Sequence, residues 1–451
     1  MKIAINNGIV VDPKNKVFSK LNITVENGKI CDISNLAMDG DTVIDADGLI
    51  VTPGFIDLHI HEGSYYADKK KFDTNIFESM LKMGVTTGIG GNCGIGPERP
   101  DEYLDAVDSI GIPINLGLFV PHNILRKEVN QLDKYAIASG DDINKMQQRA
   151  AYYLDKGCIG ISFGIRYIPG LTKEELVHIS KAAKRDNKLL SAHIRDDAAY
   201  VMAAAEEFIN IGKEIGVPIQ ISHIGSMAAF GEMERFLSLI DHHVAKGVDI
   251  SCDCYPYDAF STGIGETTYD DGFLERYGIG YDRIEIAEGK YRGQRCNEKI
   301  FKELRENYPD TITIAHVMRE EEVDRALTHP NVIVASDGYL HDGQGHPRAS
   351  GTFPRIFAKY VKEKRKLNLY EAVEKITSLP AKRLNIAGKG HLGIGADGDI
   401  AIFSLDKIMD TATFQEPIAS PKGFEYILIN GTIALQGDSI VEKNLGKTIR
   451  K

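Results

Sequence analysis

The middle of the chain alternates between two patterns of hydrophobic and polar residues. Four segments carry apolar residues at i, i+3 and i+4, as amphipathic helices do, at residues 77–84, 142–157, 172–187 and 199–216. Several of them stop at Gly or Asn, which commonly follow the last turn of a helix. Short apolar runs typical of buried parallel strands lie among them. We predict nine such strands, at residues 55–61, 85–91, 113–120, 158–164, 189–195, 218–225, 248–255, 311–317 and 332–338.

This succession of strands and helices indicates an α/β fold with a parallel sheet. The number of units fits a (β/α)₈ barrel of the TIM type best. Such a barrel holds eight strands, so one of the nine predicted strands is expected to lie outside it. The run at 311–317 or its neighbour is the candidate.

Both ends of the chain are β-rich and differ from the middle. β-Branched residues alternate with polar ones in short runs, and Asn-Gly or Asp-Gly sequences break the N-terminal runs. We therefore predict one small discontinuous β-sandwich domain from residues 1–52 and 390–451, beside a barrel domain at 53–389. The Gly-rich and poorly periodic stretch at 263–310 is predicted to form a lid over the site.

The composition is that of an ordinary globular protein, with 43% hydrophobic and 26% charged residues. The net charge of -11 argues against a nucleic-acid partner. No apolar segment approaches the roughly 20 residues that a membrane-spanning helix needs, and the alternating N-terminus does not resemble a signal peptide. We expect a cytoplasmic protein that acts on a small molecule, has no nucleic-acid or membrane partner, and is a candidate homo-oligomer.

Six cysteines in a chain of 451 residues do not indicate a disulfide framework. Cys252 and Cys254 would share one face of a predicted strand, a spacing that a pair of zinc ligands can use. No second pair lies nearby in the sequence, so we favour two buried free thiols at these positions.

The stretch PGFIDLHIH, residues 53–61, carries the first chemical signal. His59 and His61 end an apolar run, and residues two apart on a strand point to the same side. Two imidazoles on one rigid element have the spacing of metal ligands. On its own, the pair is equally compatible with two structural histidines.

Further polar residues follow the carboxyl ends of other predicted strands. Cys93 follows the second strand, His193 and His223 end the fifth and sixth, and Asp337 ends the last. The active site of a (β/α)₈ barrel lies at this face, and core packing gives no reason for such residues to recur there. Thiolate and imidazole together favour Zn²⁺, which lowers the pKa of a bound water to about 7. Asp337 is then a proton acceptor for that water, a further metal ligand, or both.

These motifs and the β-rich ends resemble the amidohydrolase superfamily. Within it, the chain resembles the D-aminoacylase (N-acyl-D-amino-acid deacylase) group over essentially its whole length. The motifs that carry this second resemblance are GGNCGIG at 90–96, GISFGIRYIPG at 160–170, SAHIRD at 191–196, YPYDAFSTG at 255–263 and HPRASGTFPR at 346–355.

The resemblance implies a zinc centre built around a thiolate. Cys93 resembles the ligand that takes the place of a carbamylated lysine found in many relatives, and the fourth predicted strand contains no Lys. The implied tightly bound Zn²⁺ is held by Cys93, His193 and His223. A weaker second site would use His59 and His61 and share Cys93.

The resemblance also implies the remaining site residues and the reaction. Asp337 resembles the general base and acid, and Tyr167, Tyr255 and Arg348 fall in motifs that line the substrate pocket. Arg offers a bidentate cation to a substrate carboxylate. The implied reaction is metal-dependent hydrolysis of the amide bond of an N-acyl-D-amino acid, which yields a carboxylate and a free D-amino acid.

Two features depart from the group and leave the substrate side chain open. Relatives often carry an acidic pair after the His-x-His motif, whereas this chain has Glu62 followed by Gly63, and the stretch at 263–310 is shorter than the lid of the group. A cyclic-amide hydrolase of the dihydroorotase or hydantoinase type, or a dipeptidase acting on D- or isoaspartyl-containing peptides, stays open. A non-catalytic scaffold is the remote alternative, because such a protein is expected to have lost metal ligands.

Overall fold

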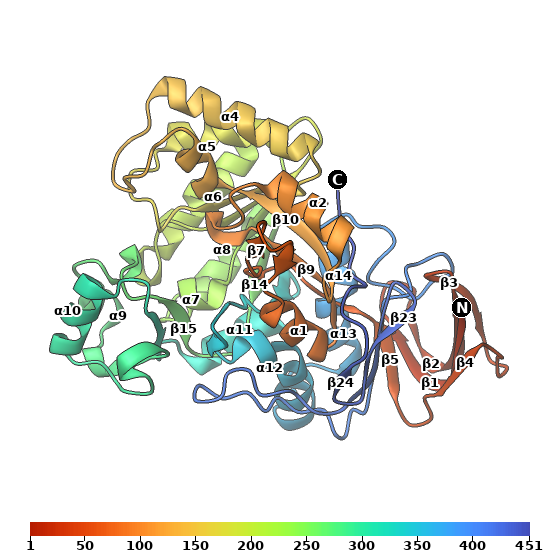
Figure 1. Cartoon of the computed structure of the whole chain (residues 1–451). Helices are drawn as coiled ribbons and strands as arrows, with labels where there is room; N and C mark the ends of the chain where they lie inside the picture. Colours follow the sequence, from red (N-terminus) through yellow and green to blue (C-terminus); the bar gives the residue numbers. More distant parts are fainter.

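Eight parallel strands form a barrel at the centre of the computed structural model, which describes residues 1–451 (Figure 1). The first and last strands meet where Asp337 N donates to His59 O and His61 N donates to Gly338 O, both at 2.9 Å. The predicted fold class, a (β/α)₈ barrel with an added β domain, is confirmed. The barrel strands are β6 (Phe55–Asp57), β9 (Val85–Gly90), β10 (Asn115–Pro121), β11 (Gly160–Gly164), β12 (Leu189–His193), β13 (Ile219–Ile221), β14 (Ile250–Cys254) and β18 (Val332–Val334).

Helices cover the outside of the barrel (Figure 1). The predicted segment at 172–187 is α-helical only from Lys173 to Ser180, because a tighter 3₁₀ turn at Lys181–Ala183 follows. No helix combines the length and the apolar character that crossing a membrane requires. The helices around the barrel are α1 (Asn75–Lys82), α2 (Pro100–Ile110), α3 (His122–Glu128), α4 (Gly140–Asp155), α5 (Lys173–Ser180), α6 (Val201–Ile215), α7 (Ile224–Ala228), α8 (Met233–Ala245), α11 (Glu320–Thr328), α12 (Arg348–Arg355), α13 (Leu369–Ile376) and α14 (Ser378–Arg383).

The strand predicted at the eighth position along the chain lies outside the barrel, as expected. It is β17 (Ile312–Ala315), which pairs antiparallel with β15 (Phe260–Gly263) and β16 (Ile284–Ile286). Helices α9 (Phe273–Tyr277) and α10 (Glu298–Asn307) belong to the same insertion. Figure 1 shows this insertion on the side of the barrel opposite to the strands of the two chain ends.

The first barrel strand is shorter than predicted. β6 ends at Asp57, whose Oδ1 accepts from His59 N at 3.1 Å and from Ser336 N at 3.0 Å. These two backbone N–H groups therefore bond to a side chain and not to the backbone of a neighbouring strand. The backbone nevertheless pairs again at Ile60, which donates to β9 at 3.0 Å. His59 and His61 are neighbours, with ring centroids 5.7 Å apart, as expected of residues on one side of a strand.

A nine-stranded sheet joins the two ends of the chain. The first half of β1 (Lys2–Asp12) pairs with β4 (Thr42–Asp45), and its second half pairs with β5 (Ile50–Pro53). β21 (Ile400–Phe403) pairs antiparallel with β5 and so links the N-terminal strands to the C-terminal ones. The sheet has a hydrophobic core of its own. The other strands are β2 (Val17–Glu26), β3 (Lys29–Ser34), β22 (Phe424–Ile429), β23 (Thr432–Gln436) and β24 (Ser439–Ile440).

Phe55 connects the barrel to this sheet. Its fully buried ring lies 5.8 Å from the rings of Phe353 and Phe357, which follow the barrel. On the other side it lies 6.2 Å from Phe403 and 6.1 Å from Phe424, both in the nine-stranded sheet. This cluster of five rings anchors the strand that leads to the two histidines.

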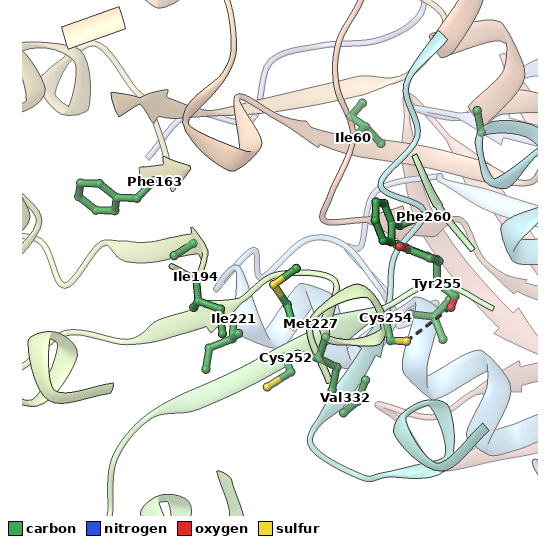
Figure 2. Close-up of a cluster of buried hydrophobic side chains, with 14 of the residues drawn as sticks. Ile60, Phe163, Ile194, Ile221, Met227, Cys252, Cys254, Tyr255, Phe260 and Val332 are labelled. Atoms are coloured by element: carbon green, nitrogen blue, oxygen red, sulfur yellow. Dashed lines mark hydrogen bonds between the residues drawn. The ribbon is translucent and has the colours of Figure 1, made fainter. Parts of the chain in front are cut away.

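Cys252 and Cys254 lie in the apolar layer between the barrel and its helices. Figure 2 shows them among Ile221, Met227 and Val332, and both residues are fully buried. Burial raises the pKa of both thiols, which disfavours the thiolate form that a zinc ligand needs. Both cysteines are buried and form no disulfide, in agreement with the favoured interpretation.

Candidate active site

The polar residues predicted from the strand ends gather at the carboxyl end of the barrel. A cavity of about 890 Å³ opens there, between the barrel and the insertion that carries β15. Its lining includes His61, Cys93, His223 and Asp337.

Two overlapping groups each bring three ligand atoms within 4.8 Å of one another. In the first, Cys93 Sγ lies 3.4 Å from His59 Nε2 and 3.3 Å from His223 Nε2. In the second, Asp337 Oδ1 lies 3.4 Å from His59 Nε2 and 3.1 Å from His61 Nε2. Because His59 belongs to both groups, the arrangement is suited to one metal ion or to two adjacent ones.

A tight turn after β9 sets the direction of the Cys93 thiol. Cys93 has a φ of 53°, a left-handed conformation that residues with a side chain rarely adopt. The preceding Asn92 donates from Nδ2 to Ile89 O at 2.9 Å and ties the turn to the end of the strand. The following Gly94 packs so closely on β11 that a Cβ atom would lie 2.6 Å from Gly164 N. The local geometry therefore accounts for Asn92 and Gly94, whereas Cys93 adopts a conformation that is unfavourable for its side chain.

Ser226 determines which nitrogen of His223 carries the proton. Its Oγ lies 2.9 Å from His223 O and 3.0 Å from His223 Nδ1. Because the hydroxyl donates its single proton to the carbonyl, it accepts a hydrogen bond from Nδ1. When His223 is neutral, as a metal ligand must be, Nε2 carries the lone pair, and this is the nitrogen that faces Cys93 Sγ.

Asp253 orients His59, a role that no sequence motif indicated. Its Oδ1 lies 3.3 Å from His59 Nδ1 and accepts from His223 N at 2.7 Å. Its Oδ2 accepts from Gln220 Nε2 at 2.9 Å, and the residue is 1% exposed. Strand alternation is the one sequence signal that could have indicated this role of Asp253. Cys252 and Cys254 face the helices, so the residue between them must face the barrel interior.

Asp337 joins the histidines to a buried arginine. Its Oδ2 forms an ion pair with Arg348 Nη2 at 2.9 Å, while Oδ1 faces His61 and His59. Burial by itself would raise the pKa of Asp337, but Arg348 and His59 hold it well below its usual range. The carboxylate is therefore ionised at neutral pH.

Arg348 lines the inner part of the cavity, and two tyrosines lie near it. The Arg348 guanidinium lies over the ring of Tyr255, with its carbon 4.6 Å from the ring centroid. Arg348 is 4% exposed, and its Nε and Nη1 have no hydrogen-bond partner, nor has the Tyr255 hydroxyl. Buried polar groups are normally paired, so these atoms indicate a site for an anionic group of a ligand. Tyr167 lines the same cavity.

His193 is packed beside the two ligand groups and belongs to neither of them. Its ring centroid lies 4.5 Å from that of His223 and 4.6 Å from that of Tyr167. Its Nδ1 is buried without a partner. Burial and the nearby His223 lower the pKa of His193, so the imidazole is neutral, as a metal ligand must be.

The donor set fits a divalent metal of the zinc type. Burial opposes ionisation of Cys93, but His59 and His223 lower the pKa of its thiol well below the ordinary value. Burial also opposes a charged His61, yet Asp337 and Cys93 raise its pKa to about 9. Protonated imidazoles thus compensate the negative charges of a buried thiolate and a buried carboxylate. In metal sites with these ligands, the metal cation compensates the same charges.

Known proteins of similar sequence match nearly the full length of this chain. Two sequence profiles of the Amidohydrolase family match residues 50–228 and 302–434. D-aminoacylase from Alcaligenes xylosoxydans xylosoxydans is 30% identical over an alignment of 482 positions, which spans 98% of this chain and 96% of that protein. The chain belongs to the D-aminoacylase group of the amidohydrolase family. The resemblance inferred from the motifs is confirmed.

Two solved structures show how closely this amidohydrolase follows the group. A crystal structure of D-aminoacylase is 28% identical and has a TM-score of 0.89, covering 100% of this chain and 99% of that chain. N-acyl-D-glutamate deacylase from Bordetella bronchiseptica, also 28% identical with a TM-score of 0.89 and the same coverage, was solved with zinc and a phosphonate inhibitor that mimics the tetrahedral intermediate. The barrel and its β domain are therefore a framework shared within this group.

The residue after the His-x-His motif of this amidohydrolase supports the Cys93 turn. Glu62 Oε2 accepts from Gly91 N at 2.7 Å, two residues before the thiol. Glu62 also lines the cavity. The single acidic residue noted in the sequence thus contributes both to the turn and to the charge of the cavity wall.

Proposed function

We propose that this amidohydrolase cleaves the amide bond of N-acyl-D-amino acids and releases a carboxylate and a free D-amino acid. The observation that carries the proposal is the Asp337–Arg348 pair beside the ligand groups of Cys93 and His59 in one cavity. Donors for a hydrolytic metal next to a buried, incompletely paired guanidinium suit a substrate whose amide neighbours a carboxylate.

The metal in this proposal is Zn²⁺. Cys93, His193 and His223 would hold one ion tightly, and His59 and His61 would form a weaker second site that shares Cys93. A thiolate with neutral imidazoles supports zinc over Mg²⁺ or Ca²⁺, which prefer oxygen ligands. When bound, zinc supplies Lewis-acid activation of the amide carbonyl and lowers the pKa of water.

Asp337 is proposed as the general base and acid. Its low pKa keeps Oδ1 unprotonated at neutral pH, so it can accept a proton from the attacking water. The same oxygen then donates the proton to the leaving amide nitrogen. Arg348 binds the other carboxylate oxygen and so keeps Oδ1 directed at the ligand groups.

Three residues are proposed to bind the substrate. The unpaired Nε and Nη1 of Arg348 are suited to the α-carboxylate, and the free hydroxyl of Tyr255 offers a further donor beside it. Burial raises the pKa of Tyr167 and of Tyr255, which keeps both phenols protonated as hydrogen-bond donors.

The test uses purified protein of known metal content with paired N-acetyl-D- and N-acetyl-L-amino acids, followed by release of free amine. We expect turnover of the D forms, its loss on chelation, and its recovery with Zn²⁺. Zinc-containing protein that hydrolyses cyclic amides or D- or isoaspartyl dipeptides, and no acylated amino acid, would contradict the proposal.

A matched pair of cysteine variants tests the ligand assignment. Cys93→Ser should lose about 100-fold in activity and a comparable factor in zinc affinity, because a weakly acidic hydroxyl replaces a thiolate. Cys31→Ser is the control, since Cys31 is exposed on the nine-stranded sheet. Full zinc content and activity in Cys93→Ser would show that Cys93 is not a ligand.

We also propose that residues 1–52 and 390–451 form one domain, that residues 53–389 form the other, and that the stretch at 263–310 is a lid. The composition of the nine-stranded sheet supports the first two assignments, and the cavity-lining positions of Glu266 and Asp310 support the third. Limited proteolysis should cut first within 263–310, and substrate should slow that cut.

For the cellular setting we propose a cytoplasmic homo-oligomer. Six free cysteines support a reducing compartment. Cell fractionation measures the location, and sedimentation of the purified protein measures the assembly.

A further inference from the structure

The walls of the large cavity carry more negative charge than the chain itself neutralises. Apart from Asp337, the lining includes five carboxylates. Glu98 is paired with Lys127 at 3.4 Å, and Glu102 with Arg99 at 2.8 Å. The remaining three have no Lys, Arg or His nitrogen within 4.0 Å: Glu62, Glu266 and Asp310.

Glu266 and Asp310 stand on adjoining backbone segments beside the proposed substrate site. Gly265 N donates to Pro309 O at 2.8 Å, which fixes the two carboxylate-bearing residues next to each other. Thr267 Oγ1 donates to Arg166 O at 2.7 Å, and Arg166 directly precedes Tyr167. Glu266 and Tyr167 line the same cavity, so this carboxylate stands beside the proposed substrate site.

A second and independent feature of the cavity indicates an anion at its inner end. Arg348 is 4% exposed, and two of its nitrogens have no hydrogen-bond partner. A ligand that satisfies both regions carries a carboxylate at one end and a positive charge at the other.

We propose that this enzyme is selective for N-acyl-D-amino acids with a positively charged side chain, D-lysine or D-arginine, whose cation lies against Glu266 and Asp310. The inference rests on the proposed deacylase function and names its substrate class. An acidic side chain, such as that of the substrate named for the N-acyl-D-glutamate deacylase relative, would meet like charge on the same wall.

The first measurement compares kcat/KM for three substrates: Nα-acetyl-D-lysine, N-acetyl-D-norleucine as a neutral chain of similar length, and N-acetyl-D-glutamate. We expect the lysine substrate to exceed norleucine by about tenfold at low salt, since a half-buried ion pair contributes roughly that factor, and glutamate to be the poorest. The preference should shrink at about 0.5 M NaCl, because salt screens the charges.

Charge variants then locate the preference. Glu266→Gln with Asp310→Asn should remove most of the tenfold lysine advantage, and Glu266→Lys should shift the preference toward N-acetyl-D-glutamate. Glu306→Gln is the control, because it removes the same charge from an exposed position of α10 outside the cavity.

The outcomes separate this inference from the deacylase function. Turnover of norleucine that equals or exceeds that of lysine, or a lysine preference that survives in the double variant, overturns the selectivity and leaves the deacylase proposal intact. Absence of turnover for every D substrate by zinc-loaded protein overturns both.

Discussion

Replacing Asp253 with Asn tests whether an orienting carboxylate, and not the ligands alone, gives the centre its metal affinity. Asn has the same shape as Asp and keeps one oxygen acceptor. That oxygen can face His59 Nδ1 and His223 N, which lie 3.3 and 2.7 Å from Asp253 Oδ1. The new amide nitrogen can face Gln220, whose Oε1 has no partner and becomes its acceptor when the side chain flips.

The substitution therefore removes charge while keeping most of the hydrogen bonds. A hydrogen bond to a charged group contributes about 1.5–3 kcal/mol, and a neutral one about 0.5–1.5 kcal/mol. We expect the loss of charge to weaken the 3.3 Å contact of Asp253 with His59 Nδ1 by about 1.4 kcal/mol, which corresponds to about a tenfold loss of zinc affinity. This lies at the lower end of the range of about 10–100-fold found for groups that orient metal ligands.

Competition with a chelating dye measures the zinc affinity, and urea unfolding of the metal-free protein shows whether the variant is folded. Asp249→Asn is the matched control. Asp249 lies just before β14, at the end of the strand opposite to the metal ligands, and its side chain is 66% exposed. A zinc affinity within about twofold of the wild type in a folded Asp253→Asn protein would refute the orienting role.

Three further substitutions probe the interface, a buried charge and substrate binding. Phe55→Ala should lower the free energy of unfolding, measured in urea, by about 3–5 kcal/mol, because a fully buried ring is removed. Phe18→Ala is the control and should change it little, because Phe18 is 57% exposed. Equal effects of the two substitutions would contradict the anchoring role of Phe55. Burial lowers the pKa of Lys375 to about 8, so the folded state binds this proton less tightly than the unfolded chain does. The buried charge therefore destabilises the folded state by a constant amount below that pKa. This destabilisation disappears as the pH rises from the folded pKa toward the unfolded one. The stability of the wild type relative to Lys375→Met should therefore rise by about 1–2 kcal/mol between about pH 7.5 and 9.5, and a constant difference would contradict the shift. Arg348→Lys should raise KM by about tenfold through loss of bidentate carboxylate binding, and an unchanged KM would remove Arg348 from the substrate site.

Several features of the fold and the site follow from short stretches of sequence. The strand and helix patterns are local, because their periods depend on backbone geometry alone. The same geometry placed His59 and His61 side by side, and the position of Cys93, His223 and Asp337 after strands indicated one face of a barrel. The local pattern was less accurate at Asp57, where a side chain takes two backbone hydrogen bonds and ends β6 early.

Other features depended on residues that are far apart in the chain. The contact of Asp253 with His59 and the pairing of β5 with β21 each join segments that are far apart in the chain, and no local pattern specifies these contacts. The same holds for the cavity wall, where Glu98 pairs with Lys127 of another segment, whereas Glu266 and Asp310 have no cation within 4.0 Å. The sequence by itself determined which elements form and which chemistry they carry. Only the tertiary structure decided which charges meet, because electrostatic and hydrogen-bond energies depend on distances across the fold.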